Sequence, residues 1–168
     1  MNIKLSMDKI YLFAYFIGLS IAGSIALSLP FAYISGIPPH GIDILFTAVS
    51  ALCVTGLSTL PMDIYSTAGF WIIMILIELG GLGIISFVSL YIAGSKRKVS
   101  LVNRVIVQQY FIEDLETNPK KIVRSIIVFT LVLEFAAAGI MYSGFSESGS
   151  TRPFFDSLFH SVSAFCNA

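Results

Sequence analysis

Three long apolar stretches constrain the fold of this chain more than any other feature. Residues 10–34 carry no charged side chain, residues 68–93 carry only Glu78, and residues 122–145 carry only Arg124 and Glu134. A helix needs roughly 20 apolar residues to cross a bilayer, and each stretch would extend about 37 Å at the helical rise per residue. The sequence therefore predicts an all-α membrane protein with three spanning helices.

The overall composition agrees with membrane lipid as the surroundings of the chain. It is 56% hydrophobic and 12% charged, whereas soluble domains are about 25% charged. The formal net charge is zero, so the basic surface that a nucleic-acid partner requires is missing. Residues 10–34 exceed the apolar core of a secretory signal, which makes a first spanning helix the better interpretation.

The basic residues orient the predicted helices. Seven of the ten Lys and Arg residues fall within residues 94–124, and none falls within residues 35–67. Because basic residues concentrate on the cytoplasmic side, we expect the N-terminus and the 94–121 loop in the cytoplasm. The predicted location is the plasma membrane, crossed several times, with residues 35–67 outside.

A sequence repeat divides the chain. Residues 43–55 and 156–168 are identical at seven of thirteen positions, with a constant offset of 113, where unrelated sequences would share about one. Each copy contains a short apolar helix, predicted over residues 42–52 and 154–165, that is too short to span a membrane. We therefore predict two re-entrant half-helices within helix–pore-loop–helix repeats.

This repeat predicts three parts of the chain. Residues 1–93 form one complete repeat, residues 94–121 form a cytoplasmic basic linker, and residues 122–168 form an incomplete second repeat. An amphipathic helix is predicted over residues 100–116, either as a linker lying at the membrane interface or as a docking surface for a cytosolic partner. Asp43 and Asp156 start the two short helices, where they either cap the helix or enrich cations at an outer mouth.

The segment after the first short helix has the chemistry of a cation site. It reads Cys53-Val54-Thr55-Gly56-Leu57 and follows the C-terminal, partly negative end of a helix. Irregular backbone at membrane depth persists where it is buried or lines water, and backbone carbonyls can replace the hydration shell of an ion. Gly56 suits such a turn because glycine tolerates backbone angles that other residues resist.

Three motifs resemble one known family, the Trk/Ktr/HKT potassium transporters. The pattern Asp-x-Leu-Phe-x-x-x-Ser-Ala-x-x-Val-Thr-Gly-Leu at residues 43–57 is similar to their first pore loop. Residues 79–83, Leu-Gly-Gly-Leu-Gly, resemble the glycine motif of their next helix, and residues 157–168 resemble their second pore loop. The resemblance implies four such repeats around one ion path, a homodimer, and a cytosolic nucleotide-binding regulatory subunit.

The resemblance also implies which residues line the ion path. By position, the filter carbonyls come from Val54, Thr55, Gly56 and Leu57, with Cys53 at the inner edge. The second quarter uses Cys166, Asn167 and Ala168, and a glycine is expected next. Potassium is the expected substrate, with no cofactor and no other metal.

Two functions follow from these observations. The leading hypothesis is transmembrane transport of potassium, a monovalent cation, through a carbonyl-lined selectivity filter. The alternative is a truncated, non-transporting membrane fragment that only associates with other transporter subunits. An enzyme is not expected, because His40 and His160 lack the neighbours of a catalytic or metal constellation.

Several residues can also be explained by a structural role alone. Cys53 and Cys166 are too few for a disulfide framework or a zinc site. Carboxylates within membrane spans are energetically unfavourable and often functional. For Glu134 we prefer a structural role near the pore to a role in proton transfer. The role of Glu78 is less defined. The glycines of residues 80–83 either permit close helix packing or allow a bend, and packing is preferred.

Overall fold

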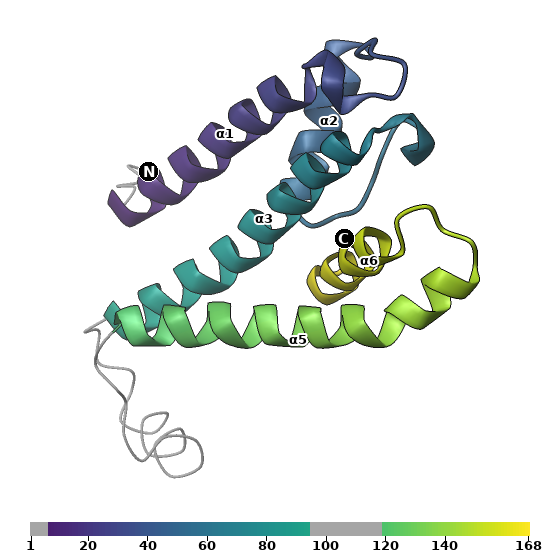
Figure 1. The fold of residues 1–168 in the computed structure, drawn as a ribbon. Helices are drawn as coiled ribbons and strands as arrows, with labels where there is room; N and C mark the ends of the chain where they lie inside the picture. Colours follow the sequence, from purple (N-terminus) through teal and green to yellow (C-terminus); the bar gives the residue numbers. More distant parts are fainter. Residues whose placement is uncertain (1–6, 95–118) are drawn as a thin grey trace.

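The computed structural model describes residues 7–94 and 119–168, and within these ranges the chain is helical and contains no β-strand (Figure 1). Two single-turn 3₁₀ helices, η1 (Pro30–Ala32) and η2 (Met62–Ile64), flank the first short helix. The α-helices of the described residues are α1 (Met7–Leu27), α2 (Gly41–Leu52), α3 (Thr67–Gly94), α5 (Pro119–Glu147) and α6 (Pro153–Cys166). The predicted all-α class is confirmed, and the amphipathic helix predicted over residues 100–116 lies outside the described residues.

Four of the predicted helices match the observed ones, and the first is shorter than expected. The short helices predicted over residues 42–52 and 154–165 correspond to α2 and α6, and the stretches 68–93 and 122–145 correspond to α3 and α5. The stretch 10–34 was wrong at its C-terminal end, because α1 ends at Leu27. Pro30 disfavours a helical conformation in the preceding residue, and Leu29 is accordingly extended, with φ −79° and ψ 139°.

The helix α5 has the properties of a membrane span. Within the described residues, its portion Val123–Glu147 is the one segment long and apolar enough to cross a bilayer by length and composition. Its large apolar side chains are exposed, including Phe129 (64%), Val132 (60%) and Ile140 (80%). Such a surface suits lipid tails. The apolar helical parts of α1 and α3 are shorter, Phe13–Leu27 and Thr67–Gly83, so three spans stay a prediction.

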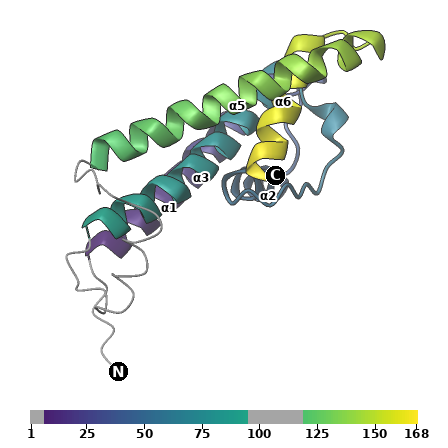
Figure 2. The same cartoon turned by 90° about the horizontal axis from the view of Figure 1, so that it is seen from below.

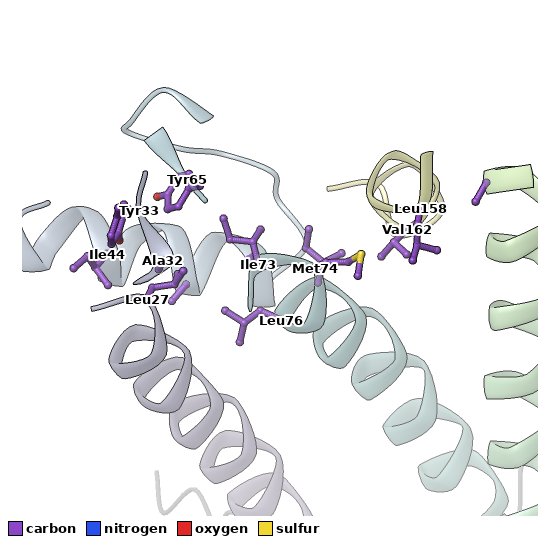
Figure 3. Packing of buried hydrophobic residues seen from close by; sticks show 14 residues of the cluster. Leu27, Ala32, Tyr33, Ile44, Tyr65, Ile73, Met74, Leu76, Leu158 and Val162 are labelled. Carbon is purple, nitrogen blue, oxygen red and sulfur yellow. The ribbon is translucent and has the colours of Figure 1, made fainter. Parts of the chain in front are cut away.

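The helix α3 is the centre of the arrangement. It contacts α1, α2, α5 and α6, and α1 and α3 run side by side in both views (Figures 1 and 2). Buried side chains of α3, among them Ile73, Met74 and Leu76, lie between the two halves of the chain (Figure 3). On one side they join Leu27 and its neighbours, and on the other they reach Leu158 and Val162 of α6. One apolar core therefore joins both repeat copies.

The glycines of α3 allow this close packing. A Cβ atom on Gly80 would overlap the backbone carbonyl of Leu52 at the end of α2. A Cβ atom on Gly81 would lie 2.8 Å from the Sγ of Cys166 at the end of α6. These contacts support the packing interpretation of residues 80–83, since any side chain would force the short helices away from α3.

A tyrosine pair fixes the loops beside α2. Tyr33 and Tyr65 form an isolated antiparallel bridge, with ring centroids 5.3 Å apart. The buried Tyr65 hydroxyl donates a hydrogen bond to the Oγ1 of Thr47 on α2, at 3.3 Å. Burial raises the pKa of Tyr33 to about 12, and the neighbouring Tyr65 adds to the increase. The side chain of Tyr33 therefore stays neutral to a higher pH than a solvent-exposed tyrosine.

Candidate filter turns at the ends of two short helices

The turn that follows α2 is closed by two hydrogen bonds to the helix end. The Val54 N–H donates to the Ala51 carbonyl at 3.1 Å, and the Thr55 N–H donates to the Ser50 carbonyl at 3.0 Å. This pair of bonds, around a residue in the left-handed conformation, is the Schellman motif. Here that residue is Val54, with φ 58°. A β-branched residue with positive φ is strained, and such strain collects at functional sites.

The turn that follows α6 repeats this geometry. The Asn167 N–H donates to the Ala164 carbonyl at 3.3 Å, and the Ala168 N–H donates to the Ser163 carbonyl at 2.9 Å. Asn167 has φ 64°, a conformation that asparagine adopts more readily than valine. Each of these four residues is the repeat partner of one in the first turn. The sequence repeat is thus also a repeat of local structure.

A serine inside each short helix anchors the turn that follows. The Ser50 Oγ lies 2.9 Å from the Oγ1 of Thr55 and accepts a hydrogen bond from the Leu57 N–H at 2.8 Å. The equivalent Ser163 donates its hydroxyl to the Ala168 carbonyl. Sequence reasoning did not identify either serine as a site residue. Their identity at matching repeat positions was the available signal.

The backbone carbonyls of the first turn have no donor among the described residues. No hydrogen bond reaches the carbonyl oxygens of residues 53–57, whereas the N–H groups of Cys53, Val54, Thr55 and Leu57 all donate within the site. The segment is exposed except for the half-buried Val54. A set of acceptors without donors, placed at the negative end of a helix, suits a cation.

The two turns lie against one another. Gly56 has φ 65°, and a Cβ atom there would overlap the backbone carbonyl carbon of Ala168. The C-terminal end of the chain accordingly lies beside α2 (Figure 2). The structure thus brings the predicted residues 53–57 and 166–168 to one place. The C-terminal ends of α2 and α6 converge there, and both carry partial negative charge.

The aspartates of the two short helices do not act as caps. The N-cap residues are His40 and Arg152, and neither caps its helix with a side-chain hydrogen bond. Asp43 instead accepts a hydrogen bond from Thr59 Oγ1 at 2.7 Å. Asp156 pairs with Arg152, with Nη2 and Oδ1 3.7 Å apart. The capping interpretation was wrong because both carboxylates lie within the first helical turn, where they hold adjacent loop residues.

Arg152 joins the start of α6 to the start of α3. Its Nη1 donates to the Oγ1 of Thr67 at 2.5 Å. Its guanidinium carbon lies 5.6 Å from the ring centre of Phe70 and 5.3 Å from that of Phe155. A guanidinium at this distance from aromatic rings is attracted to them. These contacts fix the start of α6 against the start of α3.

Comparison with known proteins places the chain in a transporter family. The family model of TrkH, described as a cation transport protein, matches residues 2–168. Among curated proteins, the potassium/sodium uptake protein NtpJ of Enterococcus hirae is 37% identical over 98% of this chain and 37% of its own length. The Ktr system potassium uptake protein B of Vibrio alginolyticus is 35% identical over 91% of this chain and 34% of its own length.

Another relative matches the chain over a shorter region. The sodium transporter HKT1 of Arabidopsis thaliana is 40% identical over 33% of this chain and 11% of its own length. The chain spans little more than a third of the length of NtpJ and of Ktr system protein B. With its family match over nearly every residue, the chain belongs to the TrkH family of cation transport proteins.

Proposed function

We propose that this chain supplies part of a pore for potassium uptake, with residues 53–57 as one quarter of a carbonyl-lined selectivity filter. The observation that carries the proposal is the set of unpaired carbonyls at the end of α2, beside the equivalent turn at Ala168. The contributing residues are Cys53, Val54, Thr55, Gly56 and Leu57 from the first turn and Cys166, Asn167 and Ala168 from the second.

The chemistry of the turns favours a monovalent cation over a divalent one. Neither turn contains a carboxylate, so an ion there would be held by neutral carbonyl dipoles. Magnesium gives up its water reluctantly, and calcium sites use several carboxylates. Potassium loses its hydration shell to carbonyl rings in known filters. The relatives named for potassium or sodium uptake support this class of substrate.

The position of the turns fits entry from outside the cell. We propose that α1, α3 and α5 span the plasma membrane, with the N-terminus and residues 94–121 in the cytoplasm and α2 and α6 re-entrant from outside. A cell-interior potential of −100 mV would then favour entry by about 2.3 kcal/mol per ion. In the whole protein, we propose a homodimer with a cytosolic nucleotide-binding regulatory subunit, as the family resemblance implies; the relatives named as parts of a Ktr system support only that partner proteins exist.

Rubidium uptake tests this function. Cells that lack their own potassium uptake should accumulate rubidium when they express a transporter containing this chain, and excess potassium should compete with it. A transporter with no potassium-competed uptake would contradict the proposal. The second hypothesis is that the chain associates with other subunits without transporting ions itself. Expression of residues 1–168 alone tests it, because rubidium uptake by this chain alone would refute it.

A further inference from the structure

Three side chains with metal-binding atoms converge where α3, α5 and α6 meet. They are Glu78 from α3, Glu134 from α5 and Cys166, the last residue of α6. One ligand atom of each lies within 4.8 Å of those of the other two. The Sγ of Cys166 lies 3.8 Å from the Oε2 of Glu78. The filter turns use backbone carbonyls, so this side-chain cluster is a separate feature of the molecule.

Each carboxylate of this cluster has one oxygen that the described residues leave without a hydrogen-bond partner. Glu134 is 2% exposed, yet its Oε1 has no hydrogen-bond partner, and the Oε1 of Glu78 also lacks one. The described residues provide no ion pair to either side chain. A buried carboxylate without a partner is strongly unfavourable, and an unsatisfied buried polar group calls for a specific explanation. A bound cation would supply the missing partner.

The backbone around the cluster leaves room for the thiol. Gly81 lies on α3 within one turn of Glu78, and a Cβ atom there would approach the Sγ of Cys166 to 2.8 Å. On the α5 side, the backbone carbonyl of Glu134 accepts a hydrogen bond from Ser161 of α6, at 2.7 Å. This bond fixes α6 beside Glu134. The three side chains are therefore held together by the packing of their helices.

We propose that Glu78, Glu134 and Cys166 form a binding site for a divalent metal ion of the zinc and cadmium class. One thiolate and two carboxylates are ligands that zinc accepts in a tetrahedral site with one open position. Typical metal–sulfur and metal–oxygen bond lengths place sulfur and oxygen about 3.5 Å apart around such an ion. The observed sulfur–oxygen distance of 3.8 Å is close to this value, and the ligand atoms, which lie within 4.8 Å of one another, would move closer together around the ion.

The ligand types also determine which ions would be excluded. Magnesium and calcium select oxygen ligands, whereas a thiolate selects softer ions. Binding would release the thiol proton of Cys166 to solvent as the metal–sulfur bond forms. The ion would then tie the end of α6 to α3 and α5, immediately before Asn167 and Ala168. It would thereby fix the position of the second turn.

The chain contains a matched control for this site. Cys53 occupies the equivalent position in the first repeat copy, but it is exposed and does not belong to the metal-ligand cluster. The Cys53→Ser variant of this 168-residue chain therefore leaves Cys166 as its one remaining thiol and removes no proposed ligand. In this variant, purified in detergent, added Cd²⁺ should produce the ultraviolet thiolate-to-metal absorption and reach saturation at one equivalent. Mg²⁺ should produce none.

Variants of the proposed ligands complete the test. Glu134→Gln and Cys166→Ser should each lower the Cd²⁺ affinity measured by titration at least tenfold, since even groups outside the ligand set typically change affinity by 10–100-fold. Circular dichroism of each variant checks that the helices remain. Absence of the absorption in Cys53→Ser, whose three ligands are intact, would overturn the proposal without relying on any ligand variant. Unchanged affinity in folded Glu134→Gln or Cys166→Ser would also overturn it.

Discussion

Gly56 lies directly against the backbone of Ala168, although the two residues belong to different repeat copies. The contact leaves no space for a Cβ atom on Gly56, whose φ of 65° also favours glycine. It brings together two turns that each end a short helix with the same pair of hydrogen bonds. The molecule thus brings the turn that follows α2 into direct contact with the turn that follows α6.

Gly56→Ala should disturb both the contact and the proposed transport. The left-handed conformation costs a non-glycine residue about 1–2 kcal/mol, and the new methyl group must also displace Ala168. We expect rubidium uptake to fall at least tenfold and the melting temperature to fall. Gly36→Ala is the matched control, because Gly36 has φ 68° and no atom within 4 Å of the position of a Cβ. Equal effects of the two substitutions would contradict a role for the Ala168 contact.

Ser50→Ala should loosen the first turn without changing the helix that carries it. The substitution removes the hydroxyl that contacts Thr55 and accepts the Leu57 N–H. Because Thr55 and Leu57 are exposed, each lost hydrogen bond should cost about 0.5–1.5 kcal/mol. We expect weaker discrimination of potassium over sodium in competition uptake assays. Ser143→Ala, which removes an exposed local hydrogen bond to the Ile140 carbonyl on α5, should leave discrimination unchanged; the same loss in both variants would argue against Ser50 as the anchor.

Gly80→Ala should lower the stability of the protein, whereas Gly139→Ala should not. At Gly80, the added methyl group meets the backbone carbonyl of Leu52, so α2 must move away from α3. At Gly139, no atom lies within 4 Å of the position of a Cβ, and alanine is favoured over glycine in a helix by about 0.5–1 kcal/mol. Thermal unfolding in detergent should show a lower midpoint for Gly80→Ala and an unchanged or higher one for Gly139→Ala. A stabilising Gly80→Ala would refute the packing role of the motif.

Arg152→Lys should weaken the link between α6 and α3 although it preserves the charge. Lysine lacks the planar guanidinium that contacts Phe70 and Phe155 while donating to Thr67. The ion pair with Asp156 is partly exposed and worth little by itself. We therefore expect a loss of about 1 kcal/mol, mostly from the aromatic and hydrogen-bond contacts. Asp156→Asn should cost less, and a larger loss in that variant would show that the ion pair dominates.

The boundaries of the helices could be predicted to within a few residues, except at the end of α1. The lengths of the apolar stretches and the positions of the prolines are local properties of the sequence. They predict α2, α3, α5 and α6 without any knowledge of tertiary contacts. The end of α1 was missed because residues 28–34 are uncharged and apolar enough to extend the run. Local conformation before Pro30 decided the boundary instead. The three-span topology remains a prediction of charge and length.

The sequence by itself determined the class of the protein and the chemistry of its turns. Long apolar stretches with few charges predict helices suited to a membrane, and the repeat marks two short helices that each end in a turn of the same kind. Tertiary structure alone decided which residues meet: Gly56 with Ala168, Ser50 with Leu57, and Glu78 with Glu134 and Cys166. The physical reason is that these contacts depend on how α2 and α6 pack against the glycines of α3. Helix periodicity reports which residues share a face, but not which distant face will cover it.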